Sequence, residues 1–217
     1  ILRMNPKRRP FIVMVETWNE LHEGTDICPS REYGDQYVRL NARYADMFRR
    51  GVQLRPQGAY ANVQEVSILL ERRPVERGIR LHSDPNGDGL MEPAEAGGVS
   101  AWRTLPNRHG VMRYAYFDVD DSFAFDEGTP LQIEVEIWDG EGTFTIEYDS
   151  TDPAGSVREG AFKPAQSFTL SNTGRWRTFR VSLNDARFAN RTNGADFRLA
   201  SAQEMLIRRA TVRKERR

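Results

Sequence analysis

Short stretches of alternating apolar and polar residues fill the chain from about residue 79 onward. In 131–139 the apolar residues stand at odd positions, and in 142–149 Phe144, Ile146 and Tyr148 share one face. Alternation with a period of two predicts strands with one buried face. Further stretches of this kind lie at 111–119, 166–170, 176–183, 196–200 and 205–212. These short strands predict an antiparallel, jelly-roll-like β-sandwich over 79–217. The residues DGEG at 139–142 predict a hairpin turn between two of them.

The first fifty residues follow a different pattern. Residues 11–19 open with the unbroken apolar run FIVMV, which predicts a strand buried on both faces. Residues 32–50 carry an amphipathic stripe that predicts a helix, with Gly51 at its C-terminal cap. A strand, a loop and a helix make one βα unit, which cannot bury both faces of its strand alone. We therefore expect 1–70 to belong to a larger α/β body, with 71–78 as the linker to the sandwich.

The composition argues against several classes of binding partner. The 217 residues hold 31 Lys and Arg against 31 Asp and Glu, so no overall charge favours nucleic acid or a membrane surface. No apolar run reaches the roughly 18 residues that a membrane helix needs. Cys28 is the single cysteine, which excludes an intrachain disulfide. The chain begins with Ile rather than Met, and we expect it to be part of a longer protein.

The polar cluster WNELHEGT, at 18–25, follows the predicted first strand. Loops after the strands of a (β/α)₈ barrel shape its active site. Two neighbouring carboxylates, here Glu20 and Glu23, can divide the acid and base roles of glycoside cleavage. Trp18 is a candidate for stacking on a sugar ring, and Asn19 and His22 are candidates for bonding its hydroxyls. The alternative is a solvated acidic loop, because two glutamates three residues apart are a common coincidence.

The stretch WNELHEGTDICPSREYGDQYV, at 18–38, resembles the W-N-E-W-H-E-G-T box of glycoside hydrolase family 99. The resemblance implies that 1–70 is the terminal βα unit of a (β/α)₈ barrel whose N-terminal part precedes it. It also implies endo-action on α-mannosides through an epoxide-like intermediate. Glu20 would deprotonate the substrate 2-hydroxyl, and Glu23 would protonate the leaving group. The chain departs from the family at Leu21, where Trp is usual. From the resemblance we expect a secreted or periplasmic protein.

A second constellation, DPNGDGLMEPAE at 84–95, matches the spacing of a calcium-binding EF-hand loop. Pro85 and Pro93 interrupt the flanking helices of a true EF-hand, so we expect a lone Ca²⁺ loop on a β-domain. The alternative is a polar turn without metal. The predicted ligands, in loop order and with the backbone carbonyl at the fourth position, are Asp84, Asn86, Asp88, Leu90, Glu92 and Glu95.

The sandwich region also carries candidates for sugar binding. Its sequence texture resembles the carbohydrate-binding-module-like sandwiches found C-terminal to bacterial glycoside hydrolases. Trp138 stands at an even position after the odd apolar positions of 131–137, so it is predicted to leave the core face, where it is a candidate platform for a sugar ring. The alternative is that the ring only packs in the core or at its rim. The acidic stretch 117–128 is a candidate second calcium or sugar site, or simply a strand end that protects a sheet edge; its aspartates are Asp118, Asp120, Asp121 and Asp126. The sequence predicts the C-terminal portion of a glycoside hydrolase with an accessory sugar-binding domain. The alternative is a non-catalytic carbohydrate-binding or structural module.

Overall fold

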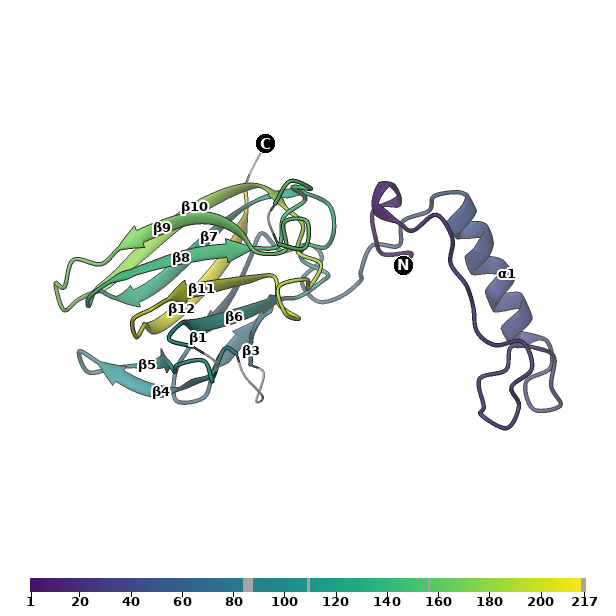
Figure 1. Ribbon diagram of the computed structural model, residues 1–217, viewed down its shortest axis with the longest axis horizontal. Coiled ribbons are helices and arrows are strands. Elements are labelled where there is room, and N and C mark those ends of the chain that lie inside the picture. The colour runs from purple at the N-terminus through teal and green to yellow at the C-terminus, as the bar shows by residue number, and fades with distance from the viewer. Residues whose placement is uncertain (84–87, 109, 156, 216–217) are drawn as a thin grey trace. The chain divides into compact units, whose positions relative to one another are not determined.

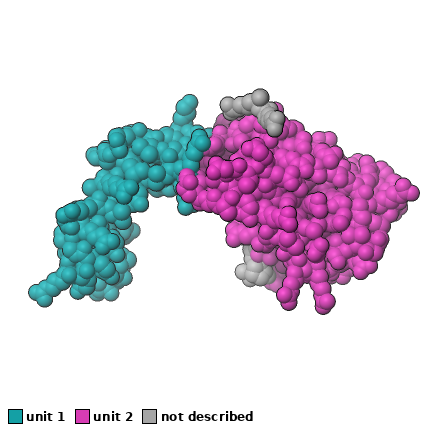
Figure 2. All heavy atoms as spheres, turned by 180° about the vertical axis from the view of Figure 1, so that it is seen from behind, with its two compact units in different colours: residues 1–55 teal, residues 56–217 magenta. Residues whose placement is uncertain are grey.

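The structure is a computed structural model that describes residues 1–83, 88–108, 110–155 and 157–215. The chain divides into two compact units, Ile1–Arg55 and Pro56–Arg217, which Figure 2 colours separately. Each unit is described by itself.

Unit 2, Pro56–Arg217, is an antiparallel β-sandwich of two sheets (Figure 1). The first sheet runs in the order β10-β7-β12-β1-β2, and β5 pairs with β12 and with β4. Its strands are β1 (Glu65–Leu69), β2 (Val75–Arg77), β4 (Met91–Ala96), β5 (Val99–Thr104), β7 (Thr129–Trp138), β10 (Trp176–Ala186) and β12 (Leu206–Lys214). The second sheet runs β3-β6-β11-β8-β9. Its strands are β3 (Ile79–His82), β6 (Arg113–Val119), β8 (Thr143–Tyr148), β9 (Lys163–Thr169) and β11 (Phe197–Ser201). Spatial neighbours are mostly distant in sequence, as in jelly-roll folds.

The core lies between the sheets and is built from alternate residues of their strands. The odd positions of β7, from Leu131 to Ile137, are fully buried, as the sequence pattern predicts. Phe144 and Ile146 of β8 meet them from the second sheet. Each fully buried side chain of this size contributes about 2 kcal/mol to the free energy of unfolding. The predicted antiparallel sandwich is confirmed.

The predicted hairpin at 139–142 is wrong, because β7 and β8 belong to opposite sheets. β7 pairs with β10 instead, with Trp138 opposite Trp176, while β8 pairs with β9. The turn residues therefore carry the chain across the core. A polar Gly-rich turn allows either path, and here the crossing places the apolar faces of β7 and β8 on opposite sides of one core.

The predicted boundary at 70–79 is also wrong. β1 pairs along its whole length with β12, and β2 pairs with β1, so both strands are part of the first sheet. Val66 and Ile68 of β1 lie in the main core. The sandwich unit therefore begins at Pro56 rather than at 79, and residues 71–78 hold a strand and a turn rather than a linker.

Unit 1 contains one α-helix among its described elements, α1 (Gln36–Arg49), and a short 3₁₀ turn, η1 (Pro6–Arg8). The predicted helix is confirmed, although it starts later than residue 32, with Asp35 as its N-cap. Gly51 adopts a left-handed φ of +67° just past its end, where glycine is favoured. In the described residues no helix has the length and apolar character needed to span a bilayer.

The predicted strand at 11–19 is not formed, and no part of a barrel is evident in the described residues. Phe11 is 93% exposed and Met14 is 90% exposed. A strand that is apolar on both faces needs neighbouring strands and a covering layer. The described residues of unit 1 form neither neighbouring strands nor a covering layer, so the apolar run stays extended and exposed.

Asp139 gives the sandwich a testable dependence on pH. Its buried carboxylate accepts hydrogen bonds from Thr173 Oγ1 (2.5 Å) and the Ser171 amide (2.7 Å), and from Arg177 Nη1 (3.2 Å). These bonds, that of Thr173 foremost, hold the pKa of Asp139 at about 2 against the opposing effect of burial. The turn after β7 is thereby tied to the turn before β10.

We expect Asp139→Asn to be less stable than the wild type at pH 7. A carboxyl group with a lowered folded-state pKa stabilises the fold above its unfolded pKa of about 4. That contribution is lost as pH falls toward 2, so the gap between the two proteins should narrow over this range. Urea denaturation at a series of pH values measures the gap. A gap that stays constant down to pH 2 would contradict the assignment.

Candidate functional site

The predicted catalytic box lies on a loop of unit 1 that backbone hydrogen bonds close. The Thr17 amide donates to the carbonyl of Thr25, and the Cys28 amide donates to that of Trp18. The loop therefore holds residues 18–25 in one compact turn on the surface of this unit.

Glu20, His22 and Glu23 lie together within this loop. His22 Nδ1 is 3.6 Å from a Glu20 carboxylate oxygen, and His22 Nε2 is 3.8 Å from one of Glu23. One ligand atom from each lies within 4.8 Å of the others, so the group could share a proton or hold a cation. The His22 side chain is 78% exposed, and Trp18 and Asn19 are also exposed. The structure thus brings the predicted residues together without enclosing a substrate.

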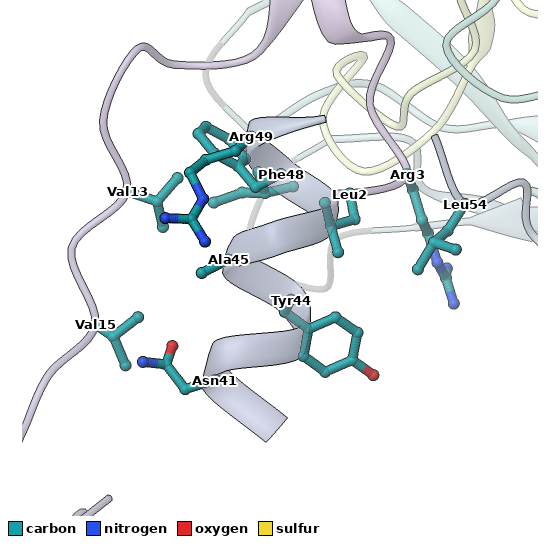
Figure 3. A pocket seen from close by; sticks show the side chains of 11 residues that line it. Leu2, Arg3, Val13, Val15, Asn41, Tyr44, Ala45, Phe48, Arg49 and Leu54 are labelled. Atoms are coloured by element: carbon teal, nitrogen blue, oxygen red, sulfur yellow. The ribbon is translucent and has the colours of Figure 1, made fainter. Parts of the chain in front are cut away.

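An apolar groove of about 740 Å³ lies elsewhere in unit 1, between the extended segment and helix α1 (Figure 3). Val13 and Val15 face Ala45 and Phe48 of the helix across it. The helix has no buried residue. Its apolar stripe, which the sequence predicts to be covered, is therefore open to solvent along this groove.

The predicted calcium loop does not converge in the part that the structure describes. Asp84 and Asn86 lie outside the described residues. Glu92 and Glu95 are both in β4, three residues apart in an extended strand, so they point to opposite faces about 10 Å apart. Glu92 forms an ion pair with Arg103 of the neighbouring strand. These residues do not fit an EF-hand, because β-pairing with β5 takes up the second half of the loop. Ca²⁺ binding by the remaining residues stays a prediction.

Asp88 and Leu90 have roles within the sandwich. Asp88 accepts hydrogen bonds from Asn107 Nδ2 and from the Tyr116 hydroxyl. The Leu90 carbonyl, which the loop pattern assigns to the metal, accepts the Leu105 amide. The contact with Tyr116 ties Asp88 to β6 of the second sheet.

Trp138 leaves the core face, as its even position predicts, and packs against another tryptophan. Its ring meets that of Trp176 edge to face, with 5.4 Å between centroids. A Cβ on Gly97, at the tip of the β4–β5 hairpin, would lie 2.8 Å from the Trp138 ring. Trp176 Nε1 donates to the carbonyl of Ala96 on the same hairpin. The two rings therefore fasten this hairpin to the sheet.

The four aspartates of 117–128 do not all gather into one site, although Asp118 and Asp120 line one small cavity. Asp118 pairs with Arg80, and Asp126 pairs with Arg187 at 2.6 Å. Asp120 accepts from the amide and hydroxyl of Ser122, and Asp121 accepts from Asn190. The strand-end alternative accounts for each of these contacts.

The outer face of the second sheet carries an aromatic and charged cluster that sequence reasoning missed. The guanidinium of Arg198, on β11, lies 4.2 Å from the ring centroid of Tyr114 and 4.4 Å from that of Phe162. Arg198 Nε donates to Glu147 on β8 at 2.5 Å, and Nη1 donates to the Tyr116 hydroxyl at 2.7 Å. Two aromatic rings and an ion pair thus fix one arginine in place.

Tyr116 is the anchor beneath this cluster. Its ring is almost fully buried, and burial raises the pKa of its hydroxyl, so the group stays protonated at neutral pH. The hydroxyl also accepts a hydrogen bond from Nδ2 of Asn193 at 3.1 Å. Loops from distant parts of the chain therefore meet at one phenol.

A strip of small and polar side chains continues from Tyr114 across the same face. Strand register places Ala200 of β11 opposite Tyr114 and also opposite Thr145 of β8, which in turn pairs with Ser167 of β9. The hydroxyls of Thr145 and Ser167 lie 2.7 Å apart. Four strands span roughly 14 Å at the usual spacing. Across the strands, the strip therefore presents first the aromatic ring of Tyr114, then the short side chain of Ala200, and then the two hydroxyl groups.

The sequence contains a partial signal for this cluster. Tyr114 and Tyr116 alternate with inward-facing residues of 111–119, and Arg198 does so in 196–200. These positions are therefore recognisable as outward-facing. Only the strand order β6-β11-β8, which no local pattern encodes, brings them together.

Comparisons with known proteins find similarity in solved structures alone. No family model matches the chain, and no curated protein matches it. A carbohydrate-binding module of Cellvibrio mixtus lichenase 5A, solved with cellotriose, is 12% identical with a TM-score of 0.36. The match covers 69% of this chain and 97% of that module. The xylan-binding CBM22-1 domain of Paenibacillus barcinonensis Xyn10C is 11% identical with a TM-score of 0.40. This match covers 70% of this chain and 96% of that domain.

The matches extend beyond sugar-binding modules. The K1 cleaved adhesin domain of Lys-gingipain from Porphyromonas gingivalis is 13% identical with a TM-score of 0.37, covering 70% of this chain and 96% of that domain. At these scores the fold assignment rests on the strand pairing itself. None of the matches supports the resemblance of 18–38 to glycoside hydrolase family 99.

We expect Arg198→Gln to destabilise the sandwich by about 2 kcal/mol. The Arg198 side chain is 15% exposed, and its loss leaves Glu147 half-buried without a cation. Arg180→Gln is the matched control, because its pair with Glu134 is on the exposed side of the other sheet and should cost less than about 1 kcal/mol. Urea denaturation compares the two. Equal losses would show that the cluster has no special role in the fold.

Proposed function

We propose that the sandwich of unit 2 is a carbohydrate-binding module whose ligand lies on the outer face of the second sheet. The single observation that supports this is the strip from Tyr114 across Ala200 to Thr145 and Ser167. Sugar rings stack their C–H faces on aromatic rings and offer hydroxyls to nearby polar groups. The strip arranges both kinds of group on rigid strands, which fits one segment of a glycan chain.

The arginine cluster prepares this surface for binding. Phe162 and Tyr114 flank the guanidinium of Arg198, and Glu147 holds one of its edges. Glu147 remains 18% exposed, so its carboxylate can accept a sugar hydroxyl without rearrangement. Groups fixed in advance lose little entropy when a ligand binds, which favours affinity.

We expect Tyr114→Ala to weaken glycan binding about tenfold, which corresponds to about 1.4 kcal/mol. A screen against an array of neutral polysaccharide fragments first identifies the ligand. Isothermal titration calorimetry then measures its Kd for the wild type and the variants. Tyr33→Ala, which removes an exposed tyrosine of unit 1, is the control and should leave the Kd unchanged. An unchanged Kd in Tyr114→Ala would refute the placement of the site.

A hydrolytic role for the natural protein that carries this chain is a second proposal. It is favoured by the juxtaposition of Glu20 and Glu23 on either side of His22. The resemblance to glycoside hydrolase family 99 assigns the base to Glu20 and the acid to Glu23, with an α-mannoside as substrate. A pair this exposed requires further polypeptide to enclose the sugar. Such a protein is also proposed to be secreted or periplasmic, where polymeric glycans are met.

For this role we expect Glu20→Gln and Glu23→Gln each to reduce turnover about 10²–10⁴-fold in the natural protein. Glu32→Gln, which removes a nearby exposed carboxylate outside the box, should retain activity. Release of reducing ends from α-mannan oligosaccharides provides the rate. Full activity in both box variants would leave the sugar-binding module as the function.

A further inference from the structure

The outer face of the first sheet contains a small cup over the neighbouring strands β12, β1 and β2. Its volume is about 200 Å³. The residues that line it are Glu65, Ser67, Leu69, Val75, Arg77 and Arg209. The cup is on the opposite sheet from the strip at Tyr114, so it is a separate surface of the sandwich.

Strand register explains how these side chains meet. Leu69, in the middle strand, is opposite Arg209 of β12 and opposite Val75 of β2. Arg77 follows Val75 by two residues, so the two share a face. Two aliphatic side chains thus form a floor, with an arginine from each neighbouring strand beside it.

The two arginines of the cup carry uncompensated charge. Among the residues that the structure describes, the side chains of Arg77 and Arg209 make no hydrogen bond and no ion pair. Glu65, the one acid in the lining, is occupied by Arg213, whose Nε lies 2.5 Å from its carboxylate. The cup therefore presents two free guanidinium groups.

The nearest acid in sequence does not neutralise them. Glu76 pairs with Ile68, a core-facing residue, and therefore points to the opposite side of β2 from Arg77. There it lines a different cavity with Tyr60 and Asp118. By contrast, Arg180 on the same sheet is matched to Glu134 at 2.6 Å. The charge of Arg180 is therefore compensated, whereas those of Arg77 and Arg209 are not.

We propose that this cup binds an acidic sugar residue through its carboxylate or sulfate group, as a second glycan site of the sandwich. Guanidinium groups bind such oxyanions with paired, charge-assisted hydrogen bonds. The Ser67 hydroxyl adds a donor, and Leu69 and Val75 offer an apolar floor for the C–H face of the ring. The size suits one sugar residue rather than a long chain. The assignment rests on the proposed carbohydrate-binding function and extends it to anionic glycans.

The test compares three oligosaccharides on the full chain by isothermal titration calorimetry at low salt. One is a galacturonate trimer, one is a sulfated galactose trimer and one is a neutral galactose trimer. Arg77→Gln and Arg209→Gln should each weaken binding of at least one acidic trimer about tenfold. Arg180→Gln removes the same charge from the same sheet and should change the Kd less than twofold. The acidic trimer that binds more tightly identifies the anionic group.

Three outcomes overturn the proposal. They are no binding of either acidic trimer by the wild type, unchanged binding in Arg77→Gln and Arg209→Gln, and an equal loss in Arg180→Gln, which would indicate general attraction to positive charge. Thermal unfolding confirms that each variant is folded. Tyr114→Ala separates this proposal from the first: neutral-glycan binding that depends on Tyr114, without any effect of the two arginines, would sustain the module and refute the cup.

Discussion

One shared apolar core constrains the whole sandwich. Each strand can bury only one of its two faces, so Leu131 and Ile133 from one sheet must meet Phe144 and Ile146 from the other. The opposite faces are then obliged to turn outward. The strands consequently display half of their side chains on two outer surfaces, where the packing demands of the core do not apply.

The two outer surfaces differ in how they handle charge. On the second sheet, aromatic rings enclose the guanidinium of Arg198, and a strip of hydroxyl groups lies beside it. On the first sheet, arginines and glutamates pair across the strands, as Arg180 does with Glu134. Arg209 of β12 and Arg77 of β2 depart from this pattern, and their charges are uncompensated within the described residues. A neutral sugar suits the first kind of surface, and an anion suits the second.

Unit 1 illustrates what happens where the core constraint is not met. Its apolar run at Phe11 and its helix stripe have no covering layer in the described residues, and the helix buries none of its side chains. The carboxylates of Glu20 and Glu23 are correspondingly surrounded by solvent. Chemistry at this box depends on burial that unit 1 by itself does not supply, whereas the sandwich has all the packing that its surfaces need.

The amino-acid sequence by itself determined the sandwich, because alternation with a period of two states which face of each strand is buried. It also determined helix α1, through its stripe and the glycine that ends it. It failed for 11–19, since an apolar run becomes a strand only beside partners that it cannot specify. It failed again at 139–142, where the same turn residues suit a hairpin or a crossing between sheets.

Only the tertiary structure decided which outward residues become neighbours. Tyr114, Arg198 and Glu147 are on three strands far apart in sequence, and Arg77 and Arg209 are separated by most of the sandwich. The local pattern marks all of them as outward-facing. Their assembly into sites follows from strand order, which is set by the packing of the entire core and therefore cannot be read from any single segment.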